Sequence, residues 1–109
     1  MNVENYILSK IENIILLESA VSELAETMGH TTTTPLSTSL LCLELGLNID
    51  ERDKLISHLS LLSEKKNLDF SEIRAELESI VPKITDFSDD VLKGMVEVIS
   101  KNFDLNWFI

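Results

Sequence analysis

The chain has 109 residues, 19 of them acidic against nine lysines and arginines, so its formal net charge at pH 7 is −10. This length fits one domain, residues 1–109, and an acidic surface of this size repels nucleic acid and anionic membranes while it attracts basic proteins. A single cysteine excludes an intramolecular disulfide, and two histidines and one cysteine lack the spacing of a zinc site.

Apolar residues at helical spacing, together with only three glycines and two prolines, predict an all-α fold. The expected architecture is a small helical bundle of four to five helices. The first helix should begin at about Val3 and end near Met28, with Gly29 as its C′ residue. Its apolar stripe is nearly heptad, as in a coiled-coil seam, and is interrupted by Glu18. The stripe consists of Ile7, Ile11, Ile14, Val21, Ala25 and Met28.

The second helix is expected to start at Pro35, with Thr34 as its N-cap, and to end at Gly46. Asn48 should cap the third helix, with Glu51 in the capping-box position. The corner between these helices, residues 43–49, is similar to the turn of a helix-turn-helix. The helix start that follows it carries nearly balanced charges, which is not the pattern of a helix that reads base edges. We therefore expect no binding of nucleic acid and do not favour a transcription factor.

The clearest local signal is the start of the fourth helix, where Asp69 is the N-cap and Glu72 its capping-box partner. Leu68 can pack on Ile73 as a hydrophobic staple, and Pro82 should stop this helix.

A fifth helix is expected to begin near Thr85 or Asp86, with Asp89 and Asp90 in its first turn. Gly94 inside this helix weakens it, which suggests that another part of the chain packs closely there. The terminal Trp107-Phe108-Ile109 either closes the core, the interpretation we favour, or belongs to a contact patch.

Catalytic and metal sites are not indicated, and no cofactor is expected. Cys42 lies in an apolar run and should be a small buried hydrophobe. His58, beside Leu55 and Leu59 on its helix, should pack at the boundary of the core, and His30, in a loop, should be solvated. The start of the chain lacks the basic and apolar regions of a signal peptide, and its apolar runs are too short to cross a bilayer. The expected compartment is therefore the cytoplasm.

Residues 84–99, ITDFSDDVLKGMVEVI, resemble the specificity helix of the nuclease-colicin immunity proteins, in which an acidic helix start faces a basic toxin. The immunity proteins of contact-dependent growth inhibition are similar in kind. This resemblance implies a bacterial inhibitor of a nuclease toxin, with Asp86, Asp89, Asp90 and Glu97 as its contacts. The segment from Pro35 to Leu47 resembles instead the YhaI-like helical proteins of bacilli.

The residues themselves indicate a second acidic face on the first helix. Glu12 and Glu23 are 11 residues, or about three turns, apart and point the same way, with Glu26 close by. The predicted function is therefore an acidic helical binding protein that neutralises a basic protein. The alternative is a homo-oligomeric structural or adaptor protein in which the first helix pairs with its copy.

Overall fold

The computed structural model describes residues 2–65 and 67–105, and these residues form five α-helices and one 3-10 helix, with no strand among them. The elements are α1 (Val3–Thr27), α2 (Thr38–Glu44), α3 (Ile49–Leu62), α4 (Phe70–Ile80), the 3-10 helix η1 (Pro82–Asp86) and α5 (Asp89–Asn102). The all-α prediction is confirmed. The expected contribution of Trp107-Phe108-Ile109 to the core falls outside the described residues.

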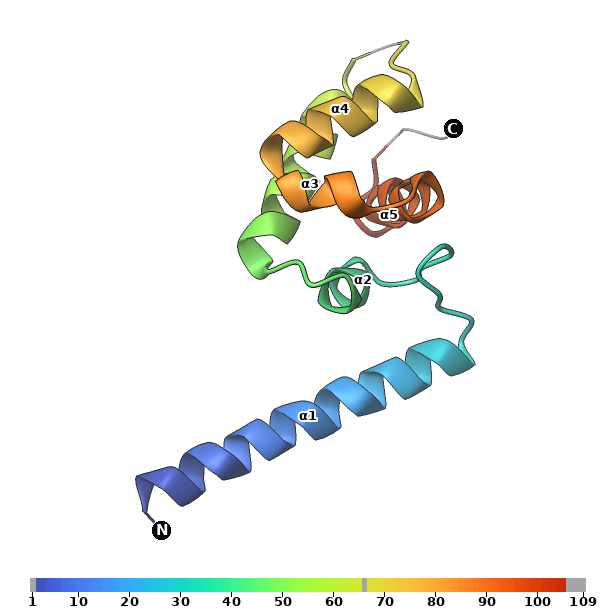
Figure 1. The fold of residues 1–109 in the computed structure, drawn as a ribbon. Helices are drawn as coiled ribbons and strands as arrows, with labels where there is room; N and C mark the ends of the chain where they lie inside the picture. The colour runs from blue at the N-terminus through green and yellow to red at the C-terminus, as the bar shows by residue number, and fades with distance from the viewer. Residues whose placement is uncertain (1, 66, 106–109) are drawn as a thin grey trace.

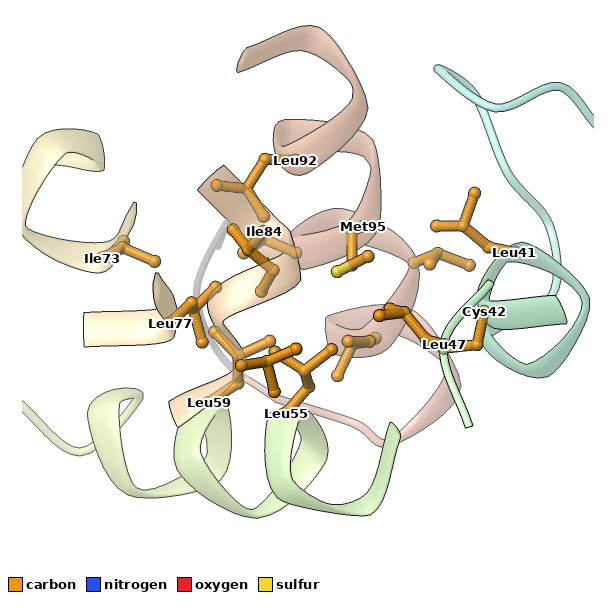
Figure 2. Close-up of a cluster of buried hydrophobic side chains, with 14 residues drawn as sticks. Leu41, Cys42, Leu47, Leu55, Leu59, Ile73, Leu77, Ile84, Leu92 and Met95 are labelled. Atoms are coloured by element: carbon orange, nitrogen blue, oxygen red, sulfur yellow. The ribbon is translucent and has the colours of Figure 1, made fainter. Parts of the chain in front are cut away.

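The hydrophobic core is built from α2 to α5 and η1, which surround it on all sides (Figures 1 and 2). Its fully enclosed side chains are Leu41, Leu55, Leu59, Leu77, Ile84, Leu92, Met95 and Ile99. Burying each such side chain stabilises the fold by about 1.5–3 kcal/mol before the entropy of ordering the chain is subtracted. The bundle therefore has a core that does not need α1.

Helix α1 lies outside this bundle and contributes no buried residue (Figure 1). It crosses below α2 in the view of Figure 1, and its N-terminal half extends beyond the other helices, which makes the molecule 59 Å long and only 29 by 24 Å across. Every apolar residue of its stripe except Ala25 is about half exposed or more. None of the described helices combines the length and the hydropathy that are needed to cross a bilayer.

Two glycines end helices as the sequence predicts. Gly29 has a φ of +98°, its N–H donates to Glu26 and the N–H of His30 donates to Ala25, which is the Schellman arrangement after α1. Gly46 (φ +74°) ends α2 in the same way. A residue with a side chain is strained at such φ values, so both turns favour glycine.

Two predicted N-caps are also present. Asn48 and Glu51 form the full capping box of α3. The Asp69 carboxylate accepts the backbone N–H of Glu72 at 2.9 Å, which confirms the N-cap of α4. The expected return bond from the Glu72 side chain is not formed between these two described residues.

The predicted start of α2 at Pro35 is wrong, because α2 begins at Thr38 with Ser37 as its N-cap. Hydrogen bonds outside the helix fix the residues around this start. The N–H of Leu36 donates to Nδ1 of His30 at 3.0 Å, and the N–H and hydroxyl of Thr38 both donate to the Asn102 side chain at 2.9 and 2.7 Å.

The predicted start of α5 near Thr85 or Asp86 is wrong as well, because these residues belong to η1 and α5 begins at Asp89. The guanidinium of Arg74 holds this turn: it donates to the carbonyl groups of Ile84 at 3.2 Å and of Phe87 at 2.7 Å. Carbonyl groups engaged in this way favour a tight turn over a continuous α-helix.

The close approach predicted at Gly94 is present, and it joins the linker between α1 and α2 to α5. A β-carbon at this position would lie 2.6 Å from the carbonyl oxygen of Thr33 and 3.1 Å from Cδ of Pro35. Only a glycine lets the linker lie this close to the helix.

Replacing Gly94 with Ala should therefore destabilise the fold by about 1–3 kcal/mol, because the clash with Thr33 outweighs the gain of about 1 kcal/mol in helix propensity. Urea unfolding followed by circular dichroism measures this change. Glu97→Ala, on the exposed side of the same helix, is the control and should change stability by less than about 0.5 kcal/mol. A stabilised Gly94→Ala protein would show that the linker does not pack there.

Asp69→Ala should lower the free energy of unfolding by about 0.5–2 kcal/mol, because it removes the N-cap acceptor of α4. Asp86→Ala removes an exposed carboxylate that caps no helix and serves as the control. Equal unfolding midpoints for the two variants would contradict a stabilising cap at Asp69.

Candidate functional site

The acidic residues assigned by resemblance lie on the turn before α5 and along its exposed side, where cations accompany them. Asp89 accepts a hydrogen bond from Nη1 of Arg74 at 2.8 Å, and Glu97 lies 3.7 Å from Nζ of Lys101. Lys93 occupies the same side of the helix, three residues after Asp90 and four before Glu97. The surface of α5 is therefore mixed in charge.

The acidic residues of α1 have no such compensation. Glu12, Glu23 and Glu26 are exposed, and none forms an ion pair within the described part of the chain. The same holds for Glu4 and Glu18. The one cation on this helix, Lys10, lies 5.5 Å from the centre of the Tyr6 ring.

The structure does not bring the two predicted acidic sets together. Helix α2 packs on α5 and lies between it and α1 (Figure 1). The set Asp86, Asp89, Asp90 and Glu97 and the set Glu12, Glu23 and Glu26 are therefore separate surfaces, and one small partner surface cannot cover both.

A shallow groove of about 460 Å³ runs between α1 and α2, and it is acidic. Its walls carry three carboxylates, from Glu18 and Glu23 of α1 and Glu44 of α2, and no lysine or arginine lines it. The remaining wall is formed by Ile15, Ser19, Ser22 and Leu43. The groove thus offers acceptor oxygens beside apolar surface, which suits the stem and head of a lysine or arginine side chain.

His30 holds the carboxylate of Glu44 in place. The predicted solvation of His30 is wrong, because its side chain is buried. Nε2 of His30 lies 2.6 Å from Oε1 of Glu44, and Nδ1 accepts the N–H of Leu36. A ring nitrogen that accepts a hydrogen bond carries no proton, so this arrangement places the proton on Nε2, which donates to Glu44. A neutral ring orients the carboxylate without cancelling its charge.

Sequence reasoning found part of this groove. Glu23 was assigned, and Glu18 was noticed as an interruption of the apolar stripe. Glu44 and His30 were missed, because they meet α1 only after the chain turns at Gly29 and packs back along the bundle. No local pattern signals a contact of that kind. His58, in the middle of α3, is partly buried, which confirms its predicted packing at the boundary of the core, and its Nε2 lies 3.0 Å from the Glu76 carboxylate.

The free thiol of Cys42 is a second position that could carry chemistry, since it lies beside a pocket of about 540 Å³ at the corner between α2 and α3. The thiol is buried in the core, as predicted. Burial raises its pKa to about 11, more than the positive charge of Arg52 lowers it. The reactive thiolate is therefore scarce at neutral pH.

At pH 8 a thiol reagent such as 5,5′-dithiobis(2-nitrobenzoate) should leave Cys42 of the folded protein unmodified and should label it rapidly in 8 M urea, because the folded thiol is both buried and protonated. The absorbance of the released thiolate measures the reaction. Rapid labelling of the folded protein would contradict an inert core cysteine.

Comparison of the chain with protein-family models, with curated proteins and with solved structures gives no match. The candidate site therefore stands on its own geometry.

Proposed function

We propose that this chain is a binding protein without chemistry of its own, which captures a basic protein on the acidic surface formed by α1 and α2. The observation that carries the proposal is the groove lined by Glu18, Glu23 and Glu44, with no lysine or arginine in its walls. Like charges held close together repel one another, and a cationic side chain from a partner relieves that repulsion.

The charge of the whole chain supports the same class of partner. A net charge of −10 attracts a basic protein over a distance and can raise the rate of encounter by about 10 to 1,000-fold at low salt. The same field disfavours nucleic acid and anionic membranes. An inhibitor that covers a basic active site needs no catalytic residue, so a chain with this surface can act by binding alone.

Within this class, the resemblance of residues 84–99 favours an immunity protein that blocks a nuclease-type toxin in the bacterial cytoplasm. Asp89 is paired with Arg74 and Glu97 with Lys101, so the α5 surface offers a basic partner fewer unpaired carboxylates than the surface of α1 and α2 does. We assign the main contact to α1 and α2, and we assign the α5 surface, where Asp86 and Asp90 have no ion pair with a described residue, to a secondary contact.

The test is the association of the chain with the basic protein encoded by the neighbouring open reading frame. Stopped-flow measurements should show an on-rate that falls steeply between 20 and 500 mM salt, because exposed charges are screened beyond about 8 Å at physiological ionic strength. An on-rate that does not depend on salt, together with an affinity that neither charge-reversed variant below changes, would overturn the proposed function.

Charge reversal separates the two surfaces. The triple variant Glu12→Lys, Glu23→Lys and Glu26→Lys should weaken binding more than tenfold, since like charges across an interface cost several kcal/mol. The matched triple variant Asp86→Lys, Asp89→Lys and Asp90→Lys should weaken it less. If only the second triple weakens binding, the contact lies on α5 and the groove assignment is wrong.

A further inference from the structure

The longest helix of the chain presents an apolar stripe that no described residue of the chain covers. Its members are Val3, Ile7, Ile14, Leu17, Val21, Leu24 and the adjoining Met28, and their exposed fractions lie between 49% and 75%. Soluble monomers seldom leave a contiguous apolar surface of this length in water, and a helix draws most of its stability from packing such a face. The stripe therefore needs a partner.

The stripe points away from the rest of the chain. The residues of α1 that line the groove with α2, such as Ile15, Ser19 and Ser22, lie on a different side of the helix from the stripe, since Ile15 and Ser22 directly follow Ile14 and Val21 and successive residues are about 100° apart. A partner can therefore approach the stripe without displacing α2, and of the groove carboxylates it reaches only Glu18, which lies between the stripe and the groove.

The spacing of the stripe is that of a two-helix seam. One set of positions repeats every seven residues at Ile7, Ile14, Val21 and Met28, and a second set repeats at Val3, Lys10, Leu17 and Leu24. Two such sets of positions, each repeating every seven residues, are the pattern of a coiled-coil seam. The only member of either set that is not apolar is Lys10.

We propose that α1 of one copy pairs with α1 of a second copy in antiparallel orientation. A parallel pair in register would set Lys10 against Lys10 at the seam, which is unfavourable. The antiparallel pair sets Lys10 opposite Val21 of the second copy, with Glu18 of that copy one turn away and within reach of the lysine side chain. The charge complementarity between Lys10 and Glu18 therefore favours the antiparallel orientation, with a second copy of the chain as the partner.

The antiparallel register also matches the remaining seam residues. Ile7 lies opposite Leu24 of the second copy, Ile14 opposite Leu17, and Met28 opposite Val3, so the seam covers the whole of α1. Glu18 lies beside the seam, directly after Leu17, and it supplies the counter-charge for Lys10 of the other copy. Each dimer contains two such ion pairs, related by the two-fold axis.

This pairing goes beyond the capture of a basic protein and does not depend on it. Glu12, Glu23 and Glu26 lie on the side of α1 away from the seam and stay exposed in the dimer, whereas Glu18, at the edge of the groove, is the one groove carboxylate that pairs with Lys10 of the second copy. Self-association is measured on the chain alone, without a basic partner, and its outcome is therefore separate from that of the binding test.

The first experiment uses two neighbouring leucines of equal exposure. Leu17, 66% exposed, belongs to the seam, and Leu16, 67% exposed, does not. Analytical ultracentrifugation of the full chain should show a dimer for the natural protein and for Leu16→Asp, and a monomer for Leu17→Asp. The urea midpoint of the α2–α5 core should be unchanged in both variants. A monomeric natural protein, or equal effects of the two substitutions, overturns the proposal.

The second experiment tests the orientation by exchanging charges. Lys10→Glu alone and Glu18→Lys alone should each weaken the dimer by about tenfold, because each places two like charges together twice in the dimer. The double variant should regain the natural dissociation constant within about threefold, since the swapped ion pair is restored. Glu12→Lys, outside the seam, is the control and should leave the dimer intact. Failure of the double variant to recover, or a trimer or larger assembly, overturns the antiparallel dimer.

Discussion

The close packing of the linker between α1 and α2 on Gly94 of α5 is the contact on which the rest of the arrangement depends. The carbonyl group of Thr33 occupies the space where any residue other than glycine at position 94 would place its β-carbon. The bonds of Leu36 to His30 and of Thr38 to Asn102 hold the linker extended over this point. Because the linker lies against the bundle, α1 lies beyond α2 and outside the core.

Helix α1 lies outside the core, and the side that faces α2 carries different residues from the side that faces away. Its stripe of isoleucine, valine and leucine faces away from α2, whereas Glu23 lines the groove with Glu44 of α2, and Glu18 lies between the stripe and the groove. Apolar surface gains most by removal from water, whereas carboxylates gain most from a cation that remains partly hydrated. One helix can therefore serve a second copy of the chain on one side and a basic protein on the other.

The bundle and α1 also differ in how their charged side chains are paired. Arg74 joins Glu78, Asp89 and the carbonyl groups of the η1 turn, so its charge is used to hold α4, η1 and α5 together. Lys83 likewise binds Glu51 and the carbonyl group of Gly46. The backbone N–H of Asn48, which donates to Glu51, holds the pKa of this carboxyl below its usual range, and Lys83 adds to the effect. In the bundle the cations hold the helices together, whereas the carboxylates of α1 form no ion pair with a described residue.

The sequence by itself determined the helical class, the caps at Asn48 and Asp69, the C′ glycines and the burial of Cys42. Each of these depends on residues within one or two turns or on apolar spacing along one helix. Only the tertiary structure decided the starts of α2 and α5, the burial of His30 and the meeting of Glu44 with α1. These features rest on bonds between residues far apart in the chain, such as Thr38 and Asn102, which are 64 positions apart. Local preferences cannot encode such a bond, because its energy appears only after the helices have packed.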